Sequence, residues 1–412
     1  MSKFNKNNRF HMERLEDRQM MAGDVFATMS TDGTLVLLEA GNSVGGAQSV
    51  MVQPLTNGKV RVTGITSPAN IVGSNILNAN GQNLGIPEFS GVKNIQINFG
   101  DGPDQVIVGS SVKNLIPFGS VSINTEGSAF STRDNDQVFV QNLKVGQKLD
   151  IRTGAGQDGV RVVKSEVVRQ GATPPNFTIK SGVISAAGEA DKDAVTVDGV
   201  KVQGVVSIDT GASSDSLTVK NADFGFVIGT TSVDNATIRS GSGADVINIG
   251  SDANNFGFTT VRGHLTLDAG SDSQNDADIV RIQDLEVFQG LSLTLGGGND
   301  RLDMANVDIG KDMFFSAMSG NDTVVMTNVA VFDNFFAEMG EGDDTLNMIG
   351  VKARRVEANG AGGAIDRLFT YDMSNVPIIK TGFEQINGRS ISTKRVTSGL
   401  NLIPTIEPQL VR

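Results

Sequence analysis

The sequence has no cysteine and no tryptophan, and its 412 residues include one tyrosine and two histidines. Without cysteine the chain cannot form a disulfide bond, a thiolate metal site or a cysteine nucleophile. The two histidines, His11 and His264, do not form a zinc-type cluster in the sequence. Trp and Tyr, which present a large apolar ring with a polar tip, are almost missing. These absences exclude several classes of enzyme but not a folded chain, since 39% of the residues are apolar.

Basic charge and long apolar runs are also scarce. The formal net charge of −12 argues against nucleic acid or anionic membrane surfaces as partners, because both attract basic proteins. No apolar run approaches the roughly 20 residues that a membrane-spanning helix requires. We therefore expect no nucleic-acid partner and no membrane-spanning segment.

The first 24 residues are a basic leader without the apolar stretch of about 7–15 residues found in secretory signals. Within it, LEDRQMMA (15–22) resembles the LEPR-x-LL motif that opens many surface and secreted proteins of planctomycete bacteria. Asp17 stands where the motif has proline, and Met20 and Met21 stand where it has two leucines. The resemblance implies an extracellular or cell-surface location and nothing about chemistry. We expect residues 1–24 to be a disordered export segment.

A glycine-rich turn that ends in aspartate recurs along the chain. The last five of these aspartates are each 22 residues apart, and two earlier intervals are also 22. The other four intervals are 30 to 35 residues, which indicates the same unit with an insertion. The aspartates are Asp104, Asp136, Asp158, Asp193, Asp215, Asp245, Asp278, Asp300, Asp322, Asp344 and Asp366. A fixed period of this length is typical of repeat architectures.

The residues around each aspartate are equally regular. An aliphatic residue follows two positions later in all eleven units, and an apolar residue follows four positions later in ten. Such alternation predicts a half-buried strand. Six positions after the aspartate, eight units have a residue type that tolerates a left-handed backbone. These are Asn142, Gly199, Asn221, Asp284, Asn306, Asn328, Gly350 and Asp372.

Each unit thus contains about three short strands and cannot bury its apolar face alone, whereas a stack of units can. The repeat predicts an all-β fold, a parallel β-solenoid that is a right-handed three-sided β-helix with coils of about 22 residues. We place an irregular β cap at residues 25–92, the coils at 93–388, and a tail or cap at 389–412. TDGTL and TNGKV in the cap are typical hairpin turns. Gln48 takes the aspartate position of a degenerate coil.

Two roles remain open for the aspartates. In the first, each carboxylate accepts hydrogen bonds from the backbone of its own glycine corner, so the stack forms an aspartate ladder. In the second, stacked carboxylates bind Ca²⁺, which requires six to eight oxygen ligands. GGGNDRL and GEGDDTL resemble part of the repeats-in-toxin calcium motif, but that motif recurs every nine residues. The calcium hypothesis selects Asp300, Asp322, Asp343 and Asp344 as metal ligands. No other cofactor is expected.

The fold class also occurs among enzymes that cut polysaccharides, which need paired carboxylates on an outward face. One stretch, DADIVRIQD (276–284), places Arg281 among carboxylates. Single-file corner aspartates do not suit general acid–base catalysis, so we assign no catalytic residue. The sequence favours a non-catalytic exported rod with a structural, adhesive or spacer role and an extracellular partner such as a polysaccharide or matrix. Two alternatives stay open, a polysaccharide lyase or glycoside hydrolase and a calcium-dependent repeat module. Recognition is expected on the inserted loops.

Overall fold

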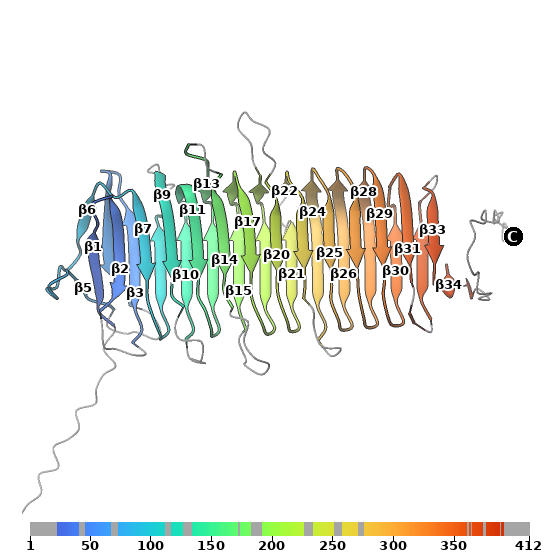
Figure 1. Cartoon of the computed structure of the whole chain (residues 1–412), viewed down its shortest axis with the longest axis horizontal. Coiled ribbons are helices and arrows are strands. Elements are labelled where there is room, and N and C mark those ends of the chain that lie inside the picture. Colours follow the sequence, from blue (N-terminus) through green and yellow to red (C-terminus); the bar gives the residue numbers. More distant parts are fainter. Residues whose placement is uncertain are drawn as a thin grey trace, which may run out of the picture.

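The computed structural model describes residues 23–40, 46–66, 73–111, 117–126, 134–171, 174–182, 192–225, 234–250, 258–270, 276–360, 362–363, 365–373, 376–387 and 389–390. The LEPR-like stretch and most of the predicted tail lie outside these ranges. The described part is all-β and forms a parallel β-solenoid, whose coils follow one another along a rod (Figure 1). No helix capable of crossing a membrane occurs among these residues.

Three ladders of parallel strands run along the rod, which confirms the predicted solenoid with three strand segments in a coil. Ladder A follows the aspartate corner. It contains β3 (Ser49–Pro54), β8 (Gln105–Gly109), β10 (Gln137–Gln141), β12 (Gly159–Val163), β15 (Ala194–Asp198), β18 (Ser216–Lys220), β21 (Val246–Gly250), the first halves of β24 (Ile279–Val287), β26 (Arg301–Ile309) and β28 (Thr323–Val331), then β30 (Thr345–Ile349), β32 (Arg367–Tyr371) and β34 (Gln385–Ile386).

Ladders B and C complete each coil. Ladder B contains the first part of β9 (Pro117–Asn124) and of β11 (Lys144–Arg152), then β13 (Glu166–Val167), β16 (Lys201–Val202), β19 (Asp223–Phe224), β22 (Thr259–Val261) and the second halves of β24, β26 and β28. Ladder C contains β2 (Thr34–Glu39), β7 (Asn94–Asn98), the ends of β9 and β11, β14 (Asn176–Lys180), β17 (Val205–Asp209), β20 (Ala236–Arg239), β23 (Leu265–Asp268), β25 (Leu291–Thr294), β27 (Met313–Ser316), β29 (Asn334–Glu338), β31 (Arg355–Asn359) and β33 (Ile378–Thr381).

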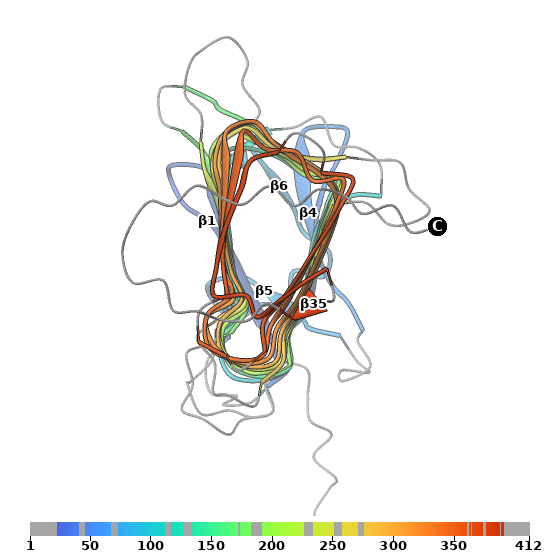
Figure 2. The same cartoon turned by 90° about the vertical axis from the view of Figure 1, so that its right-hand side faces the viewer.

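The bend between ladders A and B is made by single residues with a left-handed backbone. All eight residues selected from the sequence have φ between 50° and 67°, which confirms the prediction. Lys164 takes the same position with φ 48°, although its residue type did not indicate it. The coils therefore turn alike and superpose in the view along the rod (Figure 2). Uninterrupted coils have 22 residues, and the average spacing is about 26 because four coils carry insertions. The right-handed winding stays a prediction.

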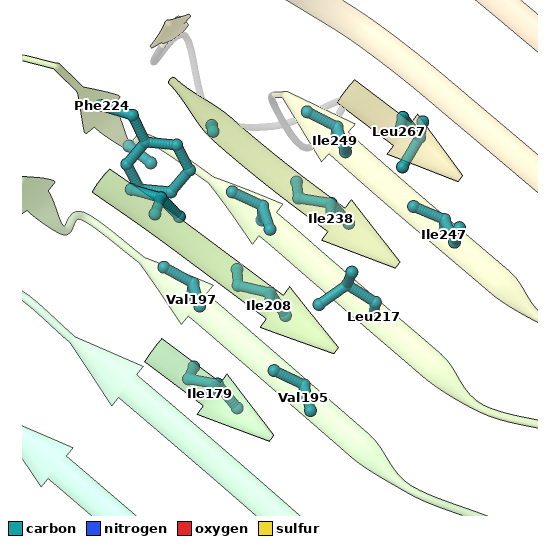
Figure 3. Close-up of a cluster of buried hydrophobic side chains, with 14 of the residues drawn as sticks. Ile179, Val195, Val197, Ile208, Leu217, Phe224, Ile238, Ile247, Ile249 and Leu267 are labelled. Carbon is teal, nitrogen blue, oxygen red and sulfur yellow. The ribbon is translucent and has the colours of Figure 1, made fainter. Parts of the chain in front are cut away.

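The interior is filled by the aliphatic residues that the alternation predicted. All eleven residues two positions after an aspartate are buried, from Val106 to Leu368. Inward side chains of successive coils lie beside one another, as Ile179, Ile208 and Ile238 do on ladder C (Figure 3). Dense packing of this kind makes the core sensitive to any change of volume or charge.

The first residues depart from the coil pattern. β1 (Val25–Met29) and β2 form an antiparallel hairpin, and so do β3 and β4 (Lys59–Gly64), so both predicted hairpin turns are present. β5 (Ile76–Leu77) and β6 (Glu88–Ser90) pair with β1 and β4. β2 and β3 then pair in parallel with β7 and β8, which joins the hairpins to the coils. At the other end β35 (Arg389–Ser390) pairs antiparallel with β34.

Candidate functional site

The repeated aspartates form one continuous buried ladder. Asp300 Oδ1 accepts a hydrogen bond of 2.8 Å from the backbone N–H of Asp278, and Asp322 Oδ1 accepts one of 2.8 Å from Asp300. The same bond joins every neighbouring pair from Asp104 to Asp366 at 2.7 to 2.9 Å. Each carboxylate therefore fastens its coil to the preceding one.

Both ends of this ladder are closed by other side chains or backbone groups. The backbone N–H of Gln48 donates to Asp104 Oδ1 at 2.7 Å, which confirms that Gln48 takes the aspartate position. The N–H of Asp366 donates to Glu384 Oε2 at 2.7 Å. A buried N–H group without an acceptor costs free energy. At each corner the backbone N–H of the aspartate has no partner in the strand pairing, and the carboxylate of the next coil accepts its hydrogen bond.

The expectation that each carboxylate bonds to its own glycine corner was wrong, because its partner is the corner of the preceding coil. The glycines have a different reason to be present. A Cβ on Gly320 would lie 1.4 Å from the carbonyl oxygen of Gly298, and the φ of Gly320 is +127°. The stacked corners approach too closely for any side chain, so glycine is needed for space as well as for backbone conformation.

Burial makes the carboxyl groups of the ladder unusually weak acids. Loss of solvation raises the pKa of Asp322 to about 8 and the pKa of both Asp344 and Asp366 to about 6. The same cause raises the pKa of Asp300 and holds the pKa of Asp104 well above its usual range. The hydrogen bond from the preceding coil opposes the rise, because it favours the charged form. Protonation of some rungs relieves the repulsion between carboxylates stacked at roughly 4.8 Å intervals.

The four aspartates selected as calcium ligands do not form one metal-binding cluster. Asp300, Asp322 and Asp344 belong to the buried ladder, whereas Asp343 is exposed in the adjacent outer row. In that row Asp343 Oδ1 accepts from the N–H of Ile365 at 3.0 Å, and Asn321 Oδ1 accepts from Asp343 at 2.7 Å. No group of three or more acidic or histidine side chains suited to a metal occurs in the part of the chain that the structure describes. Calcium binding stays a prediction that this geometry does not favour.

Arg281 and His264 do not belong to the buried aspartate ladder. Arg281 is exposed on β24 and pairs in register with Asp303. Both oxygens of Asp303 already accept from Arg301, at 2.8 and 2.7 Å. His264 Nε2 lies 2.9 Å from Ser292 Oγ. Among the described residues no carboxylate bonds to the other ring nitrogen, as a Ser-His-Asp triad would need.

A second feature lies where ladder B turns into ladder C, and we call it the aromatic corner. It consists of Phe288, Phe314, Phe332 and Phe336 with Gly310. Phe288, Gly310 and Phe332 occupy equivalent positions in three successive coils. Their N–H groups donate to the carbonyl oxygens of Val261, Val287 and Ile309, which pair with one another in register. Phe288 is 44% exposed and Phe332 is 78% exposed. Gly310 leaves an open hollow of about 510 Å³ between them.

Position 310 requires glycine for space, as position 320 does. A Cβ there would lie 2.3 Å from the carbonyl oxygen of Phe288. The two aromatic side chains therefore stand two coils apart, roughly 9.6 Å, with no side chain between them. Arg262 lies 5.2 Å from the centre of the Phe288 ring and belongs to the preceding coil. It is held there by Asp223 Oδ1 at 3.3 Å. One face of Phe288 is thus covered by a cation, and the Gly310 side is not.

The corner continues onto ladder C. Phe314 on β27 and Phe336 on β29 stack with ring centres 5.0 Å apart and an interplanar angle of 7°. Phe314 borders another hollow of about 420 Å³, which is also lined by His264, Gln289, Lys311 and Asp312. The aromatic corner therefore combines exposed ring faces with amide, cationic and anionic groups.

Sequence reasoning missed the aromatic corner because it looked for Trp and Tyr. A signal was present, since Phe314 and Phe336 are one period of 22 residues apart, and Phe288 and Phe332 are two periods apart. The expectation that recognition lies on the inserted loops concerns segments that are mostly outside the described residues.

No protein-family model matches the chain, and neither a curated protein nor a solved structure is similar to it.

Proposed function

We propose that the chain is a non-catalytic, exported β-solenoid rod with an adhesive and structural role at or beyond the cell surface. The observation that carries the proposal is the unbroken ladder from Gln48 to Glu384. Its corner carboxylates hold coils together, and they are buried away from any substrate. Asp303 on the outer surface forms an ion pair with Arg301, and the buried Asp150 forms ion pairs with Lys148 and Arg152. The outer surface thus offers contact area that extends over many coils.

A stiff rod suits adhesion and spacing. Each coil bonds to its neighbours along three ladders and through one carboxylate, so bending would break many interactions at once. The resemblance of residues 15–22 to the LEPR-x-LL motif supports a location outside the cytoplasm. Exposed aromatic side chains without covering residues supply sites for attachment.

The test is sedimentation of the full chain with insoluble material, namely a panel of neutral and acidic polysaccharides and whole bacterial cells. The released reducing ends are measured in the same tubes. Sedimentation without release of reducing ends is the expected result. Release of sugar ends would overturn the non-catalytic assignment, and failure to sediment with any material would overturn the adhesive role.

A further inference from the structure

The aromatic corner provides a slot with two uncovered aromatic walls. Phe288 and Phe332 border it, and the chain between them at Gly310 has no side chain to fill it. Two walls roughly 9.6 Å apart leave room for one ring. A ring placed midway would lie about 4.8 Å from each wall, so its axial substituents would make the closest contacts. A puckered six-membered ring with axial hydrogens or hydroxyl groups therefore fits this width better than a flat ring.

The polar groups at the slot select the chemistry of that ring. Glu286 and Asp308 offer acceptors, and Lys352 and Arg354 offer donors. None of these four side chains forms an ion pair with another described residue, so all four are free to bind a ligand. Two acids and two bases cancel, although the whole chain carries a net charge of −12. The slot therefore suits an uncharged occupant that both donates and accepts hydrogen bonds.

We propose that the slot between Phe288 and Phe332 binds a pyranose ring of a neutral polysaccharide, an inference that rests on the adhesive function proposed above. A pyranose has apolar C–H faces for the two phenylalanines and hydroxyl groups for the carboxylates and cations. The hollow beside Phe314, with Gln289, Lys311 and Asp312, lies around the same corner and receives an adjoining sugar unit. A shallow, open slot binds each unit weakly, and a polymer gains affinity through several contacts.

The geometry disfavours other occupants. An acidic polysaccharide would meet Glu286 and Asp308 at the slot without a surplus of cations to neutralise it. A protein partner would require a larger continuous apolar area than two phenylalanines separated by a glycine provide. The experiment distinguishes an acidic polysaccharide and a protein partner from a neutral polysaccharide.

The experiment is affinity electrophoresis of the full chain through gels containing a neutral soluble glucan, xylan or mannan, or an acidic polysaccharide such as polygalacturonate. The double variant Phe288→Ala/Phe332→Ala is compared with Phe258→Ala. Phe258 is a matched control, since it is 65% exposed and precedes β22, at the opposite end of ladder B from the slot. Circular dichroism melts confirm that each variant is folded. We expect at least tenfold weaker binding to the neutral polymer for the double variant and no change for Phe258→Ala.

The outcomes separate the two proposals. If the wild-type chain binds a neutral polysaccharide and the double variant binds equally well, the slot assignment is overturned while adhesion stands. The same holds if the chain binds only acidic polymers or only whole cells. If the wild-type chain binds nothing in either experiment, both the slot and the adhesive function are overturned.

Discussion

The coils before Asp278 and those after it use the same ladder with very different chain lengths. In the early region, neighbouring aspartates are 32, 35, 30 and 33 residues apart at the four long steps, and the ladder bond is 2.7 to 2.8 Å. In the late region every step is 22 residues and the bond is 2.8 to 2.9 Å. Insertions therefore leave the stacking unchanged, because the corner and its two flanking strands carry all the groups that set it.

The outer surface differs between the two regions in another way. The middle outward position of ladder C carries short hydroxyl side chains in most early coils and phenylalanine in two late ones. The row reads Ser122, Asp150, Thr178, Ser207, Thr237, Thr266, Ser292, Phe314 and Phe336. Inward positions are constrained by the core, whereas outward positions are free to specialise. The aromatic corner lies on this outer surface.

The largest effect is expected from charge placed inside the late coils. Val324→Asp would bury a carboxylate in the apolar core and lower the free energy of unfolding by about 4 kcal/mol or more. Leu302→Asp should behave in the same way. The adjacent outward change Thr323→Asp should cost less than about 1 kcal/mol. Urea melts of the three variants measure the difference. Equal losses would contradict the inward and outward assignment.

The second largest loss of stability is expected from a methyl group added at a stacked glycine corner. Gly320→Ala places Cβ 1.4 Å from the Gly298 carbonyl oxygen at φ +127°, and we expect a loss of about 3 kcal/mol. Gly58→Ala in the cap hairpin is the control, because its φ is +81° with no atom within 4 Å of the added Cβ. Backbone strain alone should cost that variant about 1 kcal/mol. If thermal melts show the same loss for both, close stacking is not what requires glycine.

The ladder bond itself can be removed in either region. Asp322→Ala leaves the buried N–H of Asp300 without its acceptor and should cost about 1–3 kcal/mol. Asp215→Ala removes the equivalent acceptor of Asp193 in the early region and should cost a similar amount. Denaturant titrations of the two variants compare the regions directly. A loss confined to one region would show that the ladder does not contribute equally along the rod.

The pH dependence of stability should reflect the raised pKa of Asp322. Its pKa is about 8 in the folded chain against an ordinary value of 3.8, so the folded state holds the proton more tightly. The resulting stabilisation is complete below pH 3.8 and is lost as the pH rises through about 8. The difference in unfolding free energy between wild type and Asp322→Asn should therefore shift against the wild type from pH 5 to pH 9. A difference independent of pH would mean that Asp322 titrates normally.

The smallest effect is expected from calcium. Asp300, Asp322 and Asp344 each keep one buried carboxylate oxygen without a hydrogen-bond partner. One such oxygen per coil falls short of the six to eight that calcium needs. The melting temperature of the full chain should be the same in EDTA and in millimolar Ca²⁺. Bound calcium would instead stabilise the fold by about 2.7 kcal/mol at a hundredfold excess over Kd. A rise with calcium but not magnesium would restore Asp343 and its neighbours as ligands.

The coil could be predicted from the sequence to a large extent. The period of the aspartates, the inward residues from Val106 to Leu368 and the left-handed bends are local properties, because strand alternation and positive φ depend on residue types a few positions apart. The bend at Lys164 escaped prediction because no local preference for it exists and the neighbouring coils impose the conformation.

What the sequence by itself determined is the coil, since its strands, corners and bends follow from spacing within 22 residues. Only the tertiary structure decided which coil each carboxylate bonds to. A hydrogen bond between Asp322 and Asp300 depends on the offset between stacked coils, which no single coil contains. The aromatic corner depends on the same stacking. Phe288 and Phe332 are 44 residues apart in the chain, and they lie one coil before and one coil after Gly310 because every coil adds only one rung to the rod.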